Sequence, residues 1–221
     1  MNSALASLRR WLGRDAPATP AGRWVVVDTE TSGLDPARDR LLGIGGVAVD
    51  RAGIHLADSF EIVLRGDAIG DAANIVVHGI GHGAQARGMP TAAALAAYRD
   101  WVAGAPLVGF HADFDRAVLR NAFAGAGIRV PDAPWLDLSP LAAALVPEAY
   151  RYGGRALDDW LAAFGIECTI RHNAAADALA TAALLEGPGC AAWFADLPEW
   201  SVYLVKDHEA QFFGPAFTQR A

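Results

Sequence analysis

The apolar pattern in the first third of the chain predicts three consecutive β-strands. Residues 24–27 read Trp-Val-Val-Val, an unbroken aromatic and β-branched run that is typical of a strand buried on both faces. Residues 41–49 and 54–64 supply two further strands, and the Asp-Arg-Ala-Gly segment at 50–53 is a hairpin turn between them. We expect the first strand to end at Asp28, where polar residues begin. The chain therefore opens with a β-meander.

The pattern after this meander changes to helices that alternate with short strands. Two brief apolar runs, 106–110 and 135–138, have the length and composition of buried strands. Apolar residues at helical spacing predict helices over five segments: 91–103, 113–124, 140–146, 156–164 and 173–186. Three meandering strands followed by alternation predict an α/β protein, in which helices flank a mixed five-stranded sheet.

Pro and Gly residues divide the chain into three parts. Residues 1–22 read as a short amphipathic helix followed by a Pro-rich linker, and residues 23–187 form the predicted domain. Residues 188–221 are rich in Trp, Phe and Tyr, so we expect this extension to pack on the domain or on a partner. Either terminal segment, 1–22 or 190–221, is a candidate for contact with a polymerase or with a second copy of the chain.

Composition excludes several classes of protein. The 221 residues are 53% hydrophobic and 19% charged, which is ample for one sizeable core and unlike a disordered or collagen-like chain. No apolar run reaches the ~20 residues of a membrane span. The leader has its arginines after its apolar residues, the reverse of a secretory signal. We therefore expect a cytoplasmic protein without a membrane contact.

The first chemical signal is a pair of carboxylates, Asp28 and Glu30, at the end of the first buried strand. Ligands of α/β proteins bind at the carboxyl ends of strands. Side chains at positions i and i+2 of a strand point to the same side, so both carboxylates can face one point. Two carboxylates that converge in this way are typical ligands of Mg²⁺ or Mn²⁺. Solvated loop acids are the alternative interpretation of this pair alone.

Two further polar clusters follow at the ends of later elements. Asp115 comes after the short strand at 106–110, near the start of the next helix. His172 precedes an alanine-rich helix, and Asp177 lies within that helix, where aspartate is otherwise a poor choice. Its small neighbours would allow the end of the sheet to approach closely. The three clusters together predict one site.

Three segments of the sequence resemble the motifs of a known family. The segments Val-Val-Asp28-Thr-Glu30-Thr-Ser-Gly-Leu34, Val-Gly-Phe-His-Ala-Asp-Phe-Asp115 and Arg-His172-Asn-Ala-Ala-Ala-Asp177 resemble the three motifs of the DEDDh 3′–5′ exonucleases. The likeness covers residues 24–186 and is greatest to the epsilon subunits of bacterial DNA polymerase III, which are proofreading exonucleases. It implies an RNase H-like fold and hydrolysis of phosphodiester bonds from the 3′ end of single-stranded DNA, with release of nucleoside monophosphates in proofreading or repair.

The resemblance also implies a role for each residue. Two divalent cations, Mg²⁺ or Mn²⁺, would be held by Asp28, Glu30, Asp115 and Asp177, and His172 would be the general base. Histidine takes up and releases protons near neutral pH, which suits that role. The residues implied in substrate binding are Thr29, Leu34, His78 and Phe114.

Departures from the family pattern and other functions remain open on the sequence. After the His-Gly-Ile segment at 78–80 the chain has Gly81 and His82, where the family usually has Thr and an acidic residue. An RNA-directed exonuclease of the same branch, or a non-catalytic module that binds nucleic acid or a polymerase, are the alternatives. The net charge of −7 and the pI of about 5.3 favour a grip on a few terminal nucleotides rather than on a long duplex.

Overall fold

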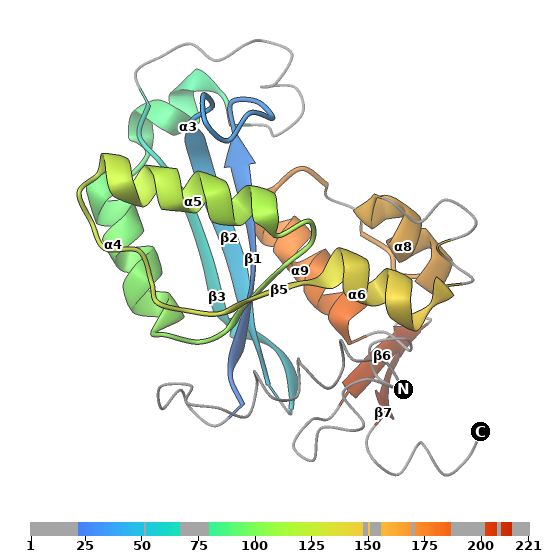
Figure 1. Ribbon diagram of the computed structural model, residues 1–221. Coiled ribbons are helices and arrows are strands. Elements are labelled where there is room, and N and C mark those ends of the chain that lie inside the picture. The colour runs from blue at the N-terminus through green and yellow to red at the C-terminus, as the bar shows by residue number, and fades with distance from the viewer. Residues whose placement is uncertain are drawn as a thin grey trace.

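A five-stranded mixed sheet lies at the centre of the fold (Figure 1). The computed structural model describes residues 22–50, 52–66, 80–147, 150, 156–168 and 171–186, and the backbone of 202–206 and 209–213. The strand order is β3-β2-β1-β4-β5, in which β1 (Trp24–Thr31), β2 (Leu41–Asp50) and β3 (Gly53–Val63) are antiparallel neighbours. Strands β4 (Leu107–Gly109) and β5 (Trp135–Asp137) run parallel to β1 and extend the sheet on its other side. The predicted β-meander and mixed sheet are confirmed.

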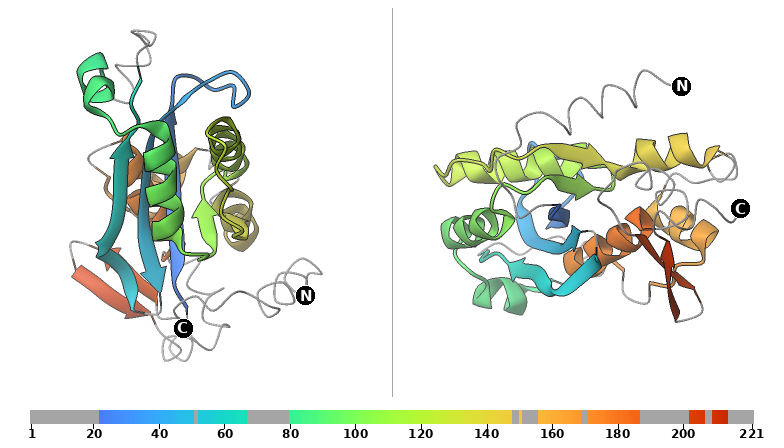
Figure 2. Two further views of the ribbon diagram at one scale, coloured as in Figure 1. Left: turned by 90° about the vertical axis from the view of Figure 1, so that its left-hand side faces the viewer. Right: turned by 90° about the horizontal axis from the view of Figure 1, so that it is seen from below.

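Helices cover both faces of this sheet, as Figure 2 shows. Helices α4 (Thr91–Val102) and α5 (Asp113–Gly125) pack on one face. Helices α6 (Leu138–Leu145), α8 (Leu157–Phe164) and α9 (Ala174–Leu185) pack on the other. Side chains of β1 alternate between the two cores, because Val25 and Val27 face α4 and α5 while Val26 faces α9. The apolar run of β1 is therefore buried on both faces.

The structure corrects the end of β1. The strand continues through Asp28 and Glu30 to Thr31, instead of ending at Asp28. Residues 28 and 30 pair in register with Gly45 and Gly43 of β2, so the ladder satisfies the backbone groups of this polar segment. A polar side chain does not end a strand when the backbone still has a partner, and this register cannot be read from β1 alone.

Three elements were not predicted from the sequence. A short helix, α3 (His82–Arg87), follows the sheet's third strand, and the hairpin of β6 (Val202–Lys206) and β7 (Glu209–Phe213) lies in the aromatic extension. Residues 1–21 of the predicted leader, and the rest of the extension, lie outside the described residues. The packing of the extension on the domain or on a partner stays a prediction. Within the described ranges, no helix combines the length and the apolar character of a membrane span.

Close contact between α9 and β2 depends on Gly45. A Cβ atom on this residue would lie 2.1 Å from the carbonyl carbon of Ala174 and 2.1 Å from the nitrogen of Ala175. Both partners are backbone atoms at the start of α9, so neither can move aside as a flexible side chain could. The helix can approach the sheet at this point only because β2 has no side chain there.

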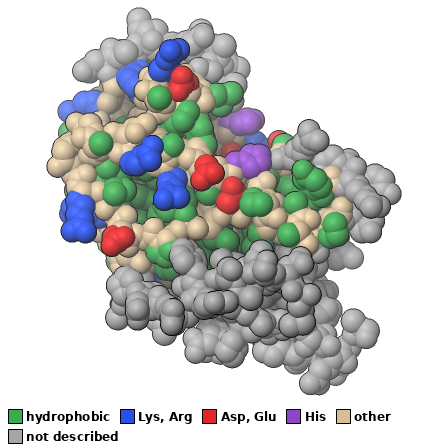
Figure 3. Space-filling model, viewed as in Figure 1, with side chains coloured by type: hydrophobic (Ala, Val, Ile, Leu, Met, Phe, Trp, Pro, Cys, Tyr) green, Lys and Arg blue, Asp and Glu red, His purple; other side chains and the backbone are tan. Residues whose placement is uncertain are grey.

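A pocket of about 520 Å³ lies on the other face, between α5 and the ends of β2 and β3. Arg40, Arg65 and Asn121 contribute to its lining. Figure 3 shows basic side chains over α5 and around α3. Exposed arginines of the elements on this side are found at 38, 40, 65, 87, 116 and 120. Acidic residues lie among them, since Arg38 pairs with Asp35 and Asp39 lines the pocket beside Arg40. We call these six exposed arginines the arginine face.

We expect Gly45→Ala to lower the free energy of unfolding by about 3 kcal/mol, because the added methyl group overlaps the backbone of α9. Chemical denaturation measures the change. Gly125→Ala is the matched control, since nothing lies within 4 Å of the added Cβ there. Equal stability of the two variants would show that α9 does not depend on this contact.

Candidate active site

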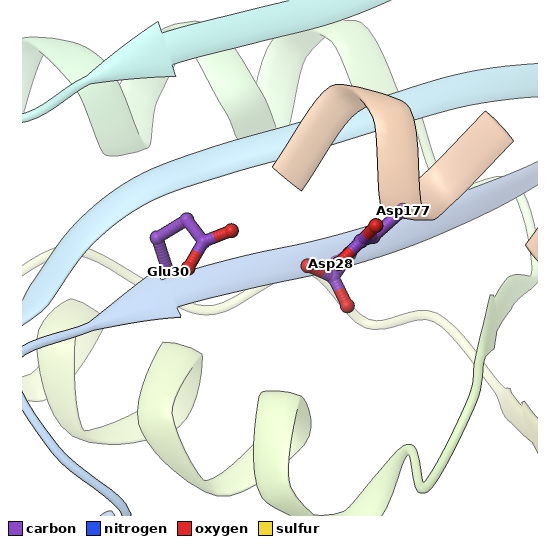
Figure 4. Close-up of side chains that lie close together, drawn as sticks. All are labelled: Asp28, Glu30 and Asp177. Carbon is purple, nitrogen blue, oxygen red and sulfur yellow. The ribbon is translucent and has the colours of Figure 1, made fainter. Parts of the chain in front are cut away.

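Three carboxylates meet at the carboxyl end of β1 (Figure 4). Asp28, Glu30 and Asp177 each offer one oxygen atom, and these atoms lie within 4.8 Å of one another. Asp28 and Glu30 project from the face of β1 that α9 covers, and Asp177 lies in the first turn of α9. Asp177 is almost 150 residues from Asp28 along the chain, so only the packing of α9 against Gly45 brings the three carboxylates together. We call these three residues the carboxylate group.

Asp115 approaches from the opposite side of β1. It lies in the first turn of α5, is 4% exposed, and is not a member of the group of three. The hydroxyl of Thr29 donates a hydrogen bond of 2.6 Å to its Oδ1. Because Thr29 points away from Asp28 and Glu30, alternate residues of one strand hold acidic groups on both of its faces.

Asp177 is fixed by the loop before α9. The backbone N–H of His172 donates to Asp177 Oδ2 at 3.1 Å. Asn173 caps the helix, with its Oδ1 accepting from the N–H of Ala176 at 2.9 Å. His172 itself is exposed and has a φ of 59°, a left-handed conformation that turns the chain into the helix. The interval of five residues between His172 and Asp177 therefore has a structural reason, because it closes this turn.

Burial and mutual repulsion make the acidic groups hard to ionise. Burial raises the pKa of Asp28 well above its usual value, and the charges of Asp115 and Glu30 raise it further. Burial, followed by the charge of Asp115, raises the pKa of Glu30 to about 7. The Arg171 guanidinium opposes both shifts. A cation placed among these groups would favour their ionised forms.

Asp115 has a raised pKa for the same main reason. Burial raises it to about 7, the hydrogen bonds from Thr29 oppose the shift, and the charge of Asp137 adds to it. Asp137 ends β5 and accepts from the N–H groups of His111 and Ser139 at 3.1 and 3.0 Å. No role was expected for Asp137 from the sequence, although it lies at the end of a short strand.

The donor set fits a hard divalent cation. Only carboxylate oxygens converge in this group, and Mg²⁺ and Mn²⁺ prefer such oxygen ligands, whereas zinc sites usually contain His or Cys. Asp177 is 7% exposed, while Asp28 and Glu30 remain half-buried and open to a small solute. The raised pKa values arise first from burial and then from repulsion between carboxylates, and a bound cation would favour the ionised forms against both effects.

The residues implied in substrate binding are placed differently from one another. Leu34 is 90% exposed on the loop after β1, which leaves it free to contact a ligand. Phe114 is half-buried against the core under α5. Thr29 is buried and its hydroxyl is engaged by Asp115. His78 lies outside the described residues.

Arg171 lies within the third motif, but the sequence indicated no role for it. Its guanidinium forms ion pairs with Asp177 and with Asp158 of α8. Its position next to His172 was the only signal in the sequence.

Fold and site together define an α/β protein of RNase H-like architecture with a carboxylate centre suited to a divalent cation. The sequence profile of the exonuclease family represented by RNase T matches residues 25–185, and the chain belongs to this family. The predicted enzyme class, an exonuclease, is confirmed. A comparison with curated proteins found no match.

Solved structures with a similar fold include exonuclease I. One such structure aligns with a TM-score of 0.63 at 23% identity over 75% of this chain. E. coli exonuclease I bound to a dT13 oligonucleotide gives a TM-score of 0.62 at 23% identity over 74%, and its zinc-bound complex with single-stranded DNA gives 0.62 at 23% over 75%. The aligned part is 40 to 41% of those proteins, so this chain matches less than half of their length. They support the RNase H-like fold.

In the absence of divalent cations, the free energy of unfolding should fall as the pH rises from about 4 to about 7. The folded protein keeps protons on Glu30 and Asp115 up to a pKa of about 7, whereas an unfolded carboxylate loses its proton near 4. The folded state thus binds more protons over this interval, and stability decreases with pH.

Asp115→Asn tests this prediction, since the amide oxygen can still accept from Thr29 and carries no charge. In EDTA at pH 8 this variant should be more stable than the wild type by roughly 2 kcal/mol, and the difference should vanish near pH 4. Urea denaturation across this pH range measures it. A constant difference at every pH would contradict the shift of Asp115.

Proposed function

We propose that this protein is a divalent-cation-dependent 3′–5′ exonuclease that acts on single-stranded DNA and releases nucleoside monophosphates. The observation that carries the proposal is the convergence of Asp28, Glu30 and Asp177 on one point at the carboxyl end of β1, in a chain of the exonuclease family. The structural likeness to exonuclease I, which was solved with bound oligonucleotides, supports single-stranded DNA as the substrate.

Four carboxylates of this chain would hold the cations. Asp28, Glu30 and Asp177 are arranged for one ion, and Asp115, which accepts a hydrogen bond from Thr29 of the same strand, would contribute to a second. Oxygen-only donors favour Mg²⁺ or Mn²⁺. Bound divalent cations supply two effects in phosphodiester hydrolysis, a lowered pKa of the attacking water and neutralisation of the charge that develops on phosphate oxygens.

His172 is the proposed general base. It is exposed beside Asp177, so its imidazole can meet a water molecule that attacks a phosphodiester from the solvent side. The backbone of the same residue holds Asp177, which couples the position of the base to that of a cation ligand. Leu34, exposed on the loop after β1, is placed to contact the terminal nucleotide.

The arginine face gives an acidic protein a surface for a polyanion. Arg116 and Arg120 are exposed on α5, whose first turn contains Asp115, and Arg40 and Arg65 line the pocket beside this helix. We infer that a bound DNA strand extends from the carboxylate group along α5. The short surface suits a few nucleotides rather than a long duplex, in agreement with the net charge of −7.

A role in proofreading or repair rests on the resemblance of the three motifs to the epsilon subunits. It stays a prediction, as do a cytoplasmic location and contact with a polymerase or second copy through residues 1–22 or 190–221.

The decisive experiment digests matched DNA and RNA oligonucleotides labelled at the 5′ or the 3′ end, with Mg²⁺, Mn²⁺ or EDTA. We expect a ladder that shortens from the 3′ end of DNA in either cation, and none in EDTA. Asp28→Asn and Asp177→Asn should reduce activity to the EDTA level. His172→Ala should lower kcat by about 10²–10⁴-fold while Mn²⁺ still binds.

Other results of this digestion would contradict the proposal. Shortening from the 5′ end would refute the polarity, faster digestion of RNA would refute the substrate, and wild-type rates in His172→Ala would refute the general base. Circular dichroism of each variant shows that a loss of activity is not a loss of fold.

The arginine face makes a separate prediction for substrate affinity. Arg116→Gln with Arg120→Gln should raise KM for a single-stranded oligonucleotide about tenfold at low salt, with little change in kcat, because phosphate contacts stabilise ground and transition states alike. The slope of log Kd against log salt should become shallower by about 1.4, since each lost phosphate contact removes ~0.7 for a single strand. Arg129→Gln, beyond the far end of α5, is the control. If the double substitution on α5 and Arg129→Gln had equal effects on KM, the DNA strand would not follow α5.

A further inference from the structure

A positively charged side chain already lies at the carboxylate group. Arg171, next to His172, is 20% exposed and makes two ion pairs, with Nη1 on Asp177 Oδ1 and Nε on Asp158 Oδ1. Its charge also opposes the raised pKa of Asp28 and Glu30, so its influence extends over all three carboxylates. A divalent cation that binds these residues therefore meets this arginine.

Both oxygens of Asp177 are engaged by groups of the protein. Oδ2 accepts from the backbone N–H of His172 at 3.1 Å, and Oδ1 contacts the Arg171 guanidinium. The backbone bond belongs to the turn that starts α9 and cannot leave without unwinding that turn. A side chain can leave by rotation alone. A cation that binds Asp177 therefore competes with Arg171 for Oδ1.

Asp158 gives the guanidinium a second place to bind. It lies in the first turn of α8, its side chain is 62% exposed, and it contacts the Nε side of Arg171 while Asp177 contacts the Nη1 side. Arg171 can release Asp177 and keep this second ion pair. Arginine is suited to such a bridge because its planar guanidinium presents several donors in different directions.

We propose that Arg171 is an exchangeable counter-cation, which neutralises the carboxylate group in the metal-free protein and withdraws onto Asp158 when a divalent cation binds Asp177. This inference rests on the proposed function, because it concerns the same cation site. Arg171 is a positioning residue here, and it regulates the binding of the metal. It keeps repelling carboxylates together without metal, and it sets the affinity for metal below what the carboxylates alone would give.

A permanent clamp is the opposite possibility, and it predicts the opposite sign. If Arg171 stayed on Asp177 to orient it for the cation, removal of the arginine would weaken metal binding. If Arg171 must leave, removal strengthens it. The sign of a single measurement therefore separates the two roles.

The test is a calorimetric Mn²⁺ titration of the full chain after removal of metal with a chelator. Arg171→Gln should bind Mn²⁺ about tenfold more tightly than the wild type, because no cation competes for Oδ1. The same variant should unfold at a lower temperature in EDTA and regain more of this loss with Mn²⁺. Arg99→Gln is the matched control, since it breaks an exposed Arg–Asp pair on α4, with Asp100, and should leave Mn²⁺ affinity unchanged. Weaker or unchanged Mn²⁺ binding by Arg171→Gln would overturn the proposal.

Asp158→Asn tests the exchange itself and leaves the arginine in place. It should weaken Mn²⁺ binding about threefold, because the withdrawn guanidinium loses its second partner. In the Arg171→Gln background the same change should have no further effect. Equal effects of Asp158→Asn in both backgrounds would mean simple charge attraction without exchange, and would overturn the proposal.

The outcome is separable from the proposed function. Tighter Mn²⁺ binding by Arg171→Gln in a protein that digests no oligonucleotide would support the exchange and refute the exonuclease activity. Digestion by the wild type, together with unchanged Mn²⁺ affinity in Arg171→Gln, would do the reverse.

Discussion

The close approach of α9 to β2 at Gly45 is the contact on which the site depends. Gly45 pairs with Asp28 across the sheet, and the backbone of Ala174 and Ala175 occupies the space that a side chain at Gly45 would need. One turn further along α9, Asp177 consequently reaches the carboxylates of β1. The missing side chain on one strand thus decides the position of a carboxylate from the far end of the domain.

Bringing these carboxylates together has an electrostatic cost that the surroundings reduce only in part. Thr29 donates to Asp115, the N–H of His172 donates to Asp177, and Arg171 contributes one positive charge. The pKa values of Asp28, Glu30 and Asp115 are nevertheless raised, first because burial disfavours their charged forms and then because neighbouring carboxylates repel them. Such a site favours cation binding because ionisation and binding stabilise each other.

The distribution of charge resolves the apparent conflict between an acidic chain and a polyanionic substrate. Several of the acidic residues lie in or near the carboxylate group, where divalent cations would offset them, whereas exposed arginines lie over α5 and beside its pocket. Net charge averages over these regions. What a phosphate backbone meets is the local surface, and on the arginine face that surface presents six exposed arginines.

The sequence by itself determined the five strands of the mixed sheet, most helices and the acidic motifs, because these follow from local apolar periodicity and from residue types at the ends of elements. It placed the end of β1 wrongly at Asp28, since strand pairing with Gly45 and Gly43 is a property of two segments. It gave no role to Arg171, Asp158 or Asp137, whose partners lie on other elements. Only the tertiary structure decided which carboxylates meet and that the Arg171 guanidinium lies beside them. The reason is that electrostatic interactions depend on distances that chain order does not encode.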